Sequence, residues 1–588
     1  LHTSLKSSPV DYGYSKKRFM QLLSYTLFGI FITGGNGHET DETCILVVVS
    51  VAMMVAMVFV VPVQATGNYV AQLYGKVTDA GQVVNKVVID YGDGVKVSGA
   101  DKDTYTVHAT NYVQIGSNNG KVYSDADRTI EKVEVAGGKV TLYMNESEGA
   151  TLTWLSESRN YPGKINYTIT QNEALKATSV DGRDLEDITG EITCDNTVID
   201  EETAKFTSVK GSQGINYQFH EAKGADKLVV WFHGNGEGDL EGYNTQNNVA
   251  QMLANRGTVA WATDEAQNIF GGAHVMSFQA PATWYYAQRD NLLEKAKTEI
   301  EEVIKKYNIN PNKVVVSGCS AGGYMTTRML IAYPDLFSAA MINCPALDTA
   351  AIRGGETPTD EELASLKNSK TAIWLVQGKT DSSVKSEVCS QRIFKILTDG
   401  AELTTTRVEQ EFNSSFTTSE TKDGKYKLSL YDTVDLEDKV DSLGETRPCG
   451  KLKFEEDYNL DGVKETVKYS DHWSWIYTLR NNPSDASGTH IWNWAATYMK
   501  DTAPVEPEKP TTPENKPSTD TTNKTDKTDK TDKTDKTDKT NKTDTTNKTE
   551  TTTKKDPVKT GDTTTFAAYI AMFVAAAFGI ILIRKKRA

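Results

Sequence analysis

The sequence predicts a multidomain protein in which an all-β sandwich comes first, an α/β domain follows, and a low-complexity tail ends in an apolar segment. Short β-branched segments separated by glycine-rich turns fill the first part. Apolar strand-like segments alternate with helical patterns in the second part, and a Thr-Asp-Lys repeat comes after them. The expected parts are a leader at 1–65, the sandwich at 66–212, the α/β domain at 213–501, a disordered stalk at 502–555 and a C-terminal signal at 556–588.

Length, charge and cysteine spacing restrict the functions open to the chain. Its 588 residues exceed the usual size of one domain. The net charge is −15, and the body of the chain has no basic patch of the kind that phosphate backbones require, so nucleic acid is not an expected partner. Because no C-x-x-C pair occurs, the sequence predicts no zinc cluster, and no metal or cofactor is expected.

The N-terminal segment predicts export. The apolar run CILVVVSVAMMVAMVFVVPVQA extends from Cys44 to Ala65 and ends in small residues, as the core of a signal peptide cleaved after Ala65 would. A second apolar stretch follows the basic residues at 16–18, so a two-span membrane hairpin is the alternative interpretation.

The C-terminal region predicts a tether at the cell surface. The repeat at 502–555 has too little apolar surface to fold, so we expect a solvated stalk. Thr565 to Ile583 is apolar and, at ~1.5 Å per residue, long enough to cross most of a ~30 Å membrane core, with RKKRA on the cytoplasmic side. With the preceding DPVKTGD, this order resembles the sorting signal that sortases cleave in Gram-positive bacteria, although Pro557 and Val558 stand where that signal has Leu and Pro. The resemblance implies an extracellular, wall- or membrane-anchored protein processed by sortase.

The predicted sandwich carries no cluster of titratable residues. Its segments KVVIDYG, KVTLYM and INYTIT are short and alternate apolar with polar residues, which is typical of strands with one buried face. An immunoglobulin-like accessory domain, a carbohydrate-binding module and a plain spacer all fit this pattern, and the spacer is the simplest interpretation.

The α/β domain is predicted from strands that are apolar on both faces. These segments are KLVVWF, TVAWAT, KVVVSG, SAAMIN and TAIWLVQ. Between the second and third lies DNLLEKAKTEIEEVIKKYN, whose apolar residues share one helical face: Leu292, Leu293, Ala296, Ile300, Val303 and Ile304. Strands of this kind alternating with helices indicate a parallel sheet, and HIWNWAATYMK is the expected last helix.

A candidate nucleophile stands between the third of these strands and the next helix. VVVSGCSAGGYMTTRM contains the pattern G-x-S-x-G, with Ser320 between Gly318 and Gly322. A strand that turns sharply into a helix pushes the serine into an exposed corner, where only small flanking residues fit. The N–H of Ala321 faces the same space and is a candidate oxyanion donor.

The loop in VVWFHGNGEGD is the candidate second half of the oxyanion hole. Gly234 and Asn235 follow a predicted strand in a glycine-rich loop. Its small side chains would let the backbone approach a substrate oxygen closely. We expect an N–H near Asn235 to act with that of Ala321. His233 is interpreted as a structural residue of this loop.

A serine hydroxyl needs a histidine base, which a carboxylate must orient. Only His472 and His490 follow Ser320, and His472 lies in a loop before an aromatic-rich helix, so it is the candidate base. Asp381 comes after a buried strand and a glycine turn, where a rigid carboxylate can reach the histidine. The order Ser320, Asp381, His472 is that of α/β-hydrolases. The alternative acids are Asp348, Asp432 and Asp435.

Taken together, HGNGEGD, GCSAGG, QGKTDSSV and HWSWIYTL resemble the motifs of secreted bacterial α/β-hydrolases of the esterase, polyhydroxybutyrate-depolymerase-like and prolyl-oligopeptidase-like group. The resemblance covers residues 66–500 and implies a serine esterase that acts through an acyl-enzyme on a small ester, an acylated glycan or a polyester. A serine peptidase of the prolyl-oligopeptidase type, or a non-catalytic surface adhesin on a hydrolase fold, is the alternative.

Two further groups of residues are candidate sites. Trp284, Tyr285, Tyr286 and Trp473 either line an acyl pocket or pack in the core. DYNLDGVKE begins like a calcium loop at Asp457, but Lys468 stands where such a loop needs a bidentate Glu, so a hairpin turn is expected there instead.

Overall fold

The computed structural model describes residues 68–155, 159–239, 247–411, 413–434 and 470–500, and short strands at 439–440, 446–447, 454–456 and 465–467. The predicted leader, stalk and C-terminal signal lie outside the described residues, as do the calcium-like residues 457–464. Among the described helices, none is long and apolar enough to cross a membrane.

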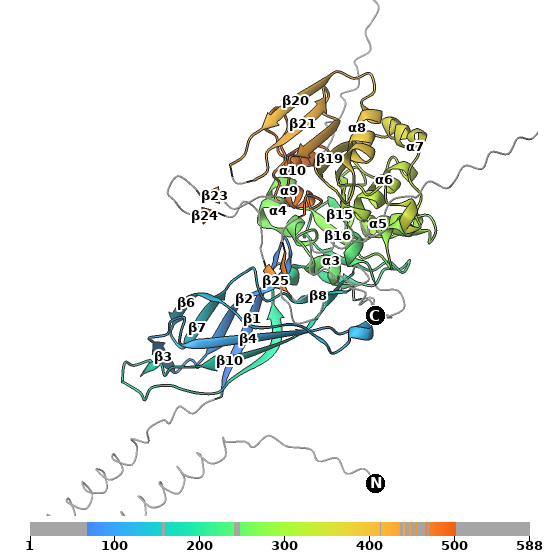
Figure 1. Cartoon of the computed structure of the whole chain (residues 1–588). Coiled ribbons are helices and arrows are strands. Elements are labelled where there is room, and N and C mark those ends of the chain that lie inside the picture. Colours follow the sequence, from blue (N-terminus) through green and yellow to red (C-terminus); the bar gives the residue numbers. More distant parts are fainter. Residues whose placement is uncertain are drawn as a thin grey trace, which may run out of the picture. The chain divides into compact units, whose positions relative to one another are not determined.

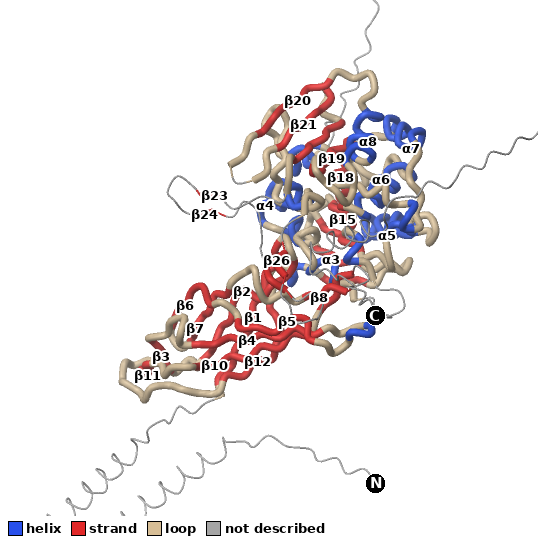
Figure 2. Tube along the Cα trace, viewed as in Figure 1, coloured by secondary structure: helices blue, strands red, loops and turns tan. Residues whose placement is uncertain are grey.

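The first domain is built from strands, as predicted (Figures 1 and 2). Eight strands form one sheet in the order β5-β4-β10-β12-β1-β2-β7-β6, and β3–β11 and β8–β9 form two-stranded sheets. The bounds are β1 (Tyr69–Thr78), β2 (Gly81–Asp90), β3 (Val95–Ser98), β4 (Tyr105–Tyr112), β5 (Val122–Asp127), β6 (Ile130–Ala136), β7 (Lys139–Met144), β8 (Leu152–Leu155), β9 (Arg159–Pro162), β10 (Lys164–Gln171), β11 (Lys176–Ser179) and β12 (Ile192–Ile199).

Alternating sequence explains these strands. In β7, Val140, Leu142 and Met144 are buried while the residues between them are more exposed, because successive side chains of a strand point to opposite faces. β1 pairs antiparallel with β2 and parallel with β12, which joins the strands into one ladder in place of two separate sheets.

The second domain contains a ten-stranded sheet in the order β13-β14-β16-β15-β17-β18-β19-β22-β21-β20. The central strands of this order, β16, β15, β17, β18, β19 and β22, are parallel. Antiparallel strands flank them on both sides. The bounds are β13 (Thr207–Val209), β14 (Tyr217–His220), β15 (Leu228–Phe232), β16 (His274–Phe278), β17 (Val314–Cys319), β18 (Ala339–Asn343), β19 (Ala372–Gly378), β20 (Leu403–Val408), β21 (Phe416–Thr421) and β22 (Tyr426–Tyr431). β13 precedes the predicted boundary at 212 and nevertheless pairs in this sheet.

Helices cover the parallel strands through two separate hydrophobic clusters. In β15, Val229 and Trp231 belong to the cluster that includes residues of α4 and α10, whereas Val230 and Phe232 belong to the one that includes residues of α5 and α6. Both faces of the strand are therefore buried, which explains its continuous apolar sequence. The helices are α3 (Ala250–Leu253), α4 (Asp264–Phe270), α5 (Leu292–Tyr307), α6 (Ala321–Ala332), α7 (Asp360–Ser365), α8 (Ser390–Leu397), α9 (Trp475–Leu479) and α10 (Ile491–Thr497).

One predicted strand is wrong. TVAWAT forms a 3₁₀ helix, η4 (Val259–Ala262), and the sheet position beside β15 is taken by β16, whose sequence HVMSF was not singled out. Two alanines weaken the β propensity of the segment, and Trp261 is instead fully buried against Trp231 and Trp492. The other four predicted strands and the helix before the serine are confirmed.

Candidate active site

Ser320 occupies a strained corner between β17 and α6. Its backbone angles are φ 55° and ψ −116°, a conformation that residues other than glycine rarely adopt. A Cβ on Gly318 would lie 2.4 Å from the Gly322 carbonyl oxygen, and one on Gly322 would lie 2.0 Å from the Phe232 carbonyl oxygen. The two glycines of the motif are therefore required by close backbone contacts.

The hydroxyl of Ser320 is buried without a hydrogen-bond partner in the described part of the chain. The residue as a whole is 1% exposed. An unsatisfied buried polar group costs about 1–3 kcal/mol of stability. A fold that keeps such a group is expected to use it for function, so the hydroxyl is a candidate catalytic group.

Asp381 and His472 form a buried pair. His472 Nδ1 lies 2.7 Å from Asp381 Oδ2, and neither side chain is exposed to solvent. The two residues are 91 positions apart in the sequence and meet because Asp381 follows β19 while His472 precedes α9.

Hydrogen bonds hold the Asp381 carboxylate in one orientation. Its Oδ1 accepts the backbone N–H groups of Ser383 at 3.0 Å and Val384 at 2.9 Å, and its Oδ2 accepts the amide of Gln377 at 3.1 Å. These bonds leave Oδ2 directed at the imidazole, which fixes the ring and its tautomer.

The loop that carries His472 is held by the residue before it. Asp471 accepts the Val434 N–H at 2.7 Å and the hydroxyl of Thr380 at 2.7 Å, and it also accepts the hydroxyl of Thr433. A Cβ on Gly378 would lie 2.3 Å from the Asp471 carbonyl oxygen, so glycine at the end of β19 lets this loop approach closely.

The other ring nitrogen of His472 faces the segment after β18. Nε2 lies 3.9 Å from Cys344 Sγ, at the outer limit of a contact with sulfur. The same segment is bonded to the Ser320 backbone: the Ser320 N–H donates to Asn343 O, and the Ala346 N–H donates to Ser320 O. Nε2 therefore faces the segment that is hydrogen-bonded to the Ser320 backbone.

The residues proposed as alternatives form other hydrogen bonds, although Asp348 lies near enough to His472 and Asp381 to interact with both electrostatically. Asp348 accepts the Lys385 N–H at 3.2 Å, Asp432 forms an ion pair with Arg407, and His490 contacts the Asn482 carbonyl oxygen. Asp435 lies outside the described residues. Of the candidate acids that the structure describes, Asp381 alone is hydrogen-bonded to His472.

The predicted oxyanion loop lies beside the serine. A Cβ on Gly234 would be 4.0 Å from Ser320 Cβ, and Asn235 begins the short 3₁₀ helix η3 (Asn235–Glu237). Ala321 begins α6, and the first N–H groups of a helix have no acceptor within it. The three residues predicted for the hole are therefore grouped around one corner.

His233 supports this loop. Its Nε2 accepts the Ala280 N–H at 2.9 Å, so Nδ1 carries the proton and donates to the Gly234 carbonyl oxygen. Burial lowers the pKa of His233 to about 3, which keeps the ring neutral. The aromatic residues weighed as a pocket are largely core: Trp284 is fully buried against Phe232, and Trp473 is 1% exposed.

One atom each of Cys344, Asp381 and His472 lies within 4.8 Å of the others, a spacing compatible with a metal site. The two contacts of His472 use opposite ring nitrogens, however, with Nδ1 on Asp381 and Nε2 toward Cys344. One ion could not replace both contacts, so the arrangement fits a hydrogen-bonded base better than a metal centre.

The sequence did not identify three residues that contact the loop at 234–237 or belong to it: Glu237, Arg159 and Asn160. Glu237 was quoted only as part of its loop, although a carboxyl between two glycines in a buried turn is itself unusual. Arg159 and Asn160 belong to β9 of the first domain, and no sequence pattern connects them with residues almost 80 positions later.

Two families match parts of this chain. The prolyl oligopeptidase family matches residues 244–398, and the esterase Ig-like N-terminal domain matches residues 72–182. No curated protein matches the sequence.

Several solved structures are similar. A thermostable esterase has 21% identity and a TM-score of 0.49, covering 70% of this chain and 96% of its own. An acetyl xylan esterase from Aspergillus awamori has 17% identity and a TM-score of 0.28 (38% and 92%). An esterase from the archaeon Pyrobaculum calidifontis has 14% identity and a TM-score of 0.24 (33% and 69%).

The two family matches agree with the two domains of the structure. Residues 72–182 coincide with strands of the β-rich domain, and residues 244–398 include the parallel strands β16, β17, β18 and β19 and the Ser320 corner. The chain therefore combines an Ig-like N-terminal domain with an α/β-hydrolase domain.

Proposed function

We propose that this protein is an exported, surface-tethered serine hydrolase that cleaves carboxylic esters through an acyl-enzyme. The observation that carries the proposal is the buried Asp381–His472 pair at 2.7 Å, directed toward a strained serine whose hydroxyl has no partner among the described residues. Strain and an unsatisfied polar group are tolerated at functional sites.

The proposed reaction begins at Ser320 Oγ. A change of side-chain rotamer brings Oγ to His472 Nε2, which takes the hydroxyl proton while Oγ attacks the ester carbonyl carbon. Asp381 holds the resulting imidazolium through Nδ1. The N–H groups of Ala321 and Asn235 donate hydrogen bonds to the carbonyl oxygen as it becomes negatively charged.

The tetrahedral intermediate then collapses. The ester C–O bond breaks, the leaving alkoxide takes the proton from Nε2, and the acyl group remains on Ser320. Water attacks the acyl carbon in the second half of the cycle and gives its proton to Nε2. Displacement of Ser320 Oγ, which regains that proton, releases the carboxylic acid and restores the enzyme.

Export and tethering rest on the sequence. The apolar run that ends at Ala65 and the span from Thr565 to Ile583 are the features that support them. Treatment of intact cells with an external protease tests this part of the proposal. Loss of the folded domain from intact cells is expected, whereas protection until lysis would contradict it.

A serine peptidase is the second candidate, because the family that matches residues 244–398 is described as prolyl oligopeptidase. The domain in front favours esters, since it matches an Ig-like domain described as that of esterases. Hydrolysis of a short chromogenic acyl ester and of a proline-containing peptide amide should be compared side by side. We expect turnover of the ester alone. Turnover of the amide alone would replace the esterase by a peptidase, and turnover of neither would favour a binding protein.

A further inference from the structure

A buried carboxyl lies under the candidate oxyanion loop and has no role in the reaction above. Glu237 ends η3, and its side chain is 7% exposed. Its Oε2 is 3.2 Å from the position that a Cβ on Gly234 would take, and 3.8 Å from His233 Nδ1. A movement of this carboxyl would therefore move the loop beside Ser320.

The partner of this carboxyl comes from the first domain. Asn160 of β9 is 1% exposed and donates its amide N–H to Glu237 Oε1 at 2.8 Å. Within the β-rich domain, β9 pairs with β8, so Asn160 is held on a strand. The bond joins residues 77 positions apart and connects the two domains at the catalytic corner.

The neighbouring residue holds the same loop from a second direction. Arg159 Nη1 donates to the Asn235 carbonyl oxygen at 3.0 Å, and Nη2 donates to the Ala282 carbonyl oxygen at 3.3 Å. A Cβ on Gly238 would lie 2.1 Å from that Ala282 oxygen, so the end of the loop is packed tightly on the same segment. The guanidinium thus connects Asn235, at the start of η3, with Ala282, which packs against Gly238 after the end of η3.

The charges around the carboxyl agree with this geometry. Burial raises the pKa of Glu237 to about 7, against the lowering effects of the Asn160 hydrogen bond and the Arg159 charge. The other titratable groups that face it are His233, which is neutral, and the Cys319 thiol, whose pKa burial raises. Removal of the Asn160 donor would leave the buried Glu237 Oε1 without its hydrogen bond, and the loop would have to rearrange.

We propose that Arg159 and Asn160 are positioning residues of the oxyanion loop, so that the N-terminal domain completes the active site and is more than a spacer. The inference rests on the proposed serine-hydrolase function. An oxyanion donor must lie about 2.7–3.1 Å from the developing charge, and a displacement of about 1 Å can cost about 10²-fold in rate. The residues of β9 act through the loop and do not touch the substrate.

The test compares two asparagines of the same domain in the full-length chain. Asn160→Ala removes the bond to Glu237. Asn111→Ala is the matched control, because Asn111 is 2% exposed and donates to the carbonyl oxygens of Ala150 and Leu152 within the β-rich domain. Both substitutions remove a buried amide, but only the first contacts the loop.

The readout is the second-order rate at which a fluorophosphonate labels Ser320, normalised to the folded fraction. Phosphonylation places an oxygen in the oxyanion hole and does not depend on the natural substrate. We expect Asn160→Ala to slow labelling by about 10- to 100-fold and to lower kcat for the ester with KM nearly unchanged, whereas Asn111→Ala stays within about twofold. Equal labelling rates in the wild type and Asn160→Ala would overturn the inference.

A second variant covers the case in which Asn160→Ala folds poorly. Asn160→Asp keeps the shape and places a second carboxyl against Glu237. At low pH one proton is shared and the bond persists, whereas at high pH two carboxylates repel each other. The labelling rate of Asn160→Asp relative to the wild type should therefore fall as the pH rises, and a ratio independent of pH would contradict the inference. A wild-type protein that is not labelled at all would overturn the proposed function itself.

Discussion

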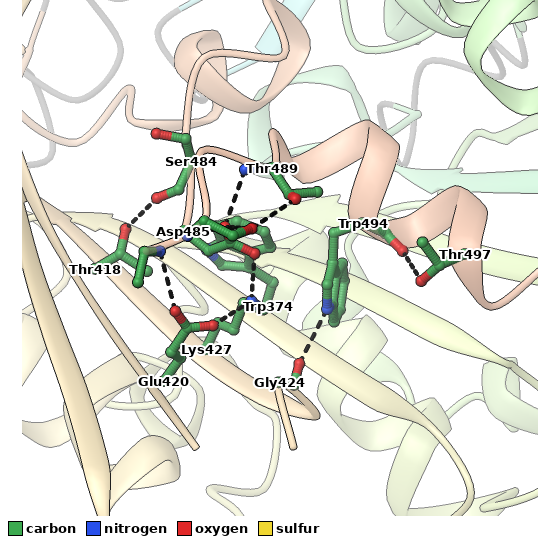
Figure 3. Close-up of polar contacts among 12 residues, drawn as sticks. Trp374, Thr418, Glu420, Gly424, Lys427, Ser484, Asp485, Thr489, Trp494 and Thr497 are labelled. Atoms are coloured by element: carbon green, nitrogen blue, oxygen red, sulfur yellow. Dashed lines mark hydrogen bonds and ion pairs between the residues drawn. The ribbon is translucent and has the colours of Figure 1, made fainter. Parts of the chain in front are cut away.

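Two buried charged clusters of the hydrolase domain differ in how completely they are hydrogen-bonded. Lys427 of β22 is 3% exposed and lies between Glu420 and Asp485, which are 12% and 8% exposed (Figure 3). At the other cluster, Asp381 and His472 are fully buried, and the hydroxyl of the candidate nucleophile Ser320 is buried without a partner in the described chain. The first cluster is saturated, and the second is not.

The Lys427 cluster satisfies its carboxylates from several sides. Asp485 accepts Lys427 Nζ at 2.7 Å and the Ser487 and Thr489 N–H groups at 2.9 Å, while Glu420 accepts the Ala486 N–H at 3.0 Å and also pairs with Lys427. Lys427 Nζ also lies 5.1 Å from the centroid of the Trp374 ring. These contacts join β21 and β22 to the loop before α10, as Figure 3 shows.

The difference shows that a buried carboxylate paired with a basic side chain can serve either stability or catalysis. A buried charge is tolerated when every partner is present, and such a cluster fixes one arrangement of the chain. A buried polar atom without a partner costs free energy, and the fold retains it where a substrate would supply the contact. We therefore expect substitutions at the two clusters to separate activity from stability.

The largest expected effect is at the serine. Ser320→Ala should reduce ester turnover by roughly 10⁶-fold, because the nucleophile is lost, while the free energy of unfolding stays equal or rises slightly, because an unsatisfied hydroxyl is removed. Steady-state kinetics and urea unfolding measure the two quantities. A less stable variant that keeps its turnover would contradict the assignment of Ser320.

The next effect is at the acid. In Asp381→Asn the backbone donors of Ser383 and Val384 keep the amide oxygen on their side, so the amide nitrogen faces His472. Nδ1 must then accept, and the proton moves to Nε2, where the base has to be free. We expect a loss of roughly 10⁴-fold in kcat with little change in melting temperature.

Two matched substitutions check this assignment of the acid. Asp348→Asn should cost less than about tenfold, since its carboxylate accepts from the Lys385 N–H, and Asp432→Asn should behave alike because it pairs with Arg407. If Asp432→Asn or Asp435→Asn is the inactive variant, the acid has been assigned wrongly while Ser320 and His472 keep their roles.

The saturated cluster should respond in the opposite way. Lys427→Met leaves Glu420 and Asp485 buried without their cation, which should cost about 3–5 kcal/mol of stability. The kcat of the folded fraction should remain within about threefold. Lys132→Met is the control, because its pair with Glu134 is exposed and is expected to contribute under about 1 kcal/mol. Urea unfolding of both variants measures the difference, and equal losses would contradict the comparison.

The sequence predicted the layers and the candidate triad because each depends on local order. β15, β17, β18 and β19 are apolar on both faces, and catalytic groups of such sheets follow the carboxyl ends of their strands. The acid, the base and the serine could be placed in this way before the structure was known, and their catalytic roles stay predictions.

Other features depend on contacts that the sequence does not show. Whether TVAWAT becomes a strand depends on where Trp261 packs, and the bond between Asn160 and Glu237 depends on how two domains meet. Lys427 gave no signal either, because a buried lysine in a strand differs from an exposed one only by its partners.

The smallest expected effect is a pH dependence of stability at Glu237. The pKa in the fold is about 7, and an unfolded glutamate has a pKa of about 4.3, so the folded state binds more protons between these values. Wild-type stability should therefore fall as the pH rises from about 4.5 to about 7, with about 3 kcal/mol lost from this group. Relative to the wild type, Glu237→Gln should gain stability over that interval in urea unfolding, and parallel curves would contradict the shift.

The central claim, that Ser320 is the nucleophile, is tested most directly by locating a covalent adduct. Wild type and Ser320→Ala are treated with a fluorophosphonate, and the modified residue is identified by mass spectrometry of peptides. We predict one adduct, on the peptide that contains Ser320, and none at this position in the variant, together with loss of ester hydrolysis. An unmodified Ser320 in an enzyme that hydrolyses esters, or full hydrolysis by Ser320→Ala, would contradict the account.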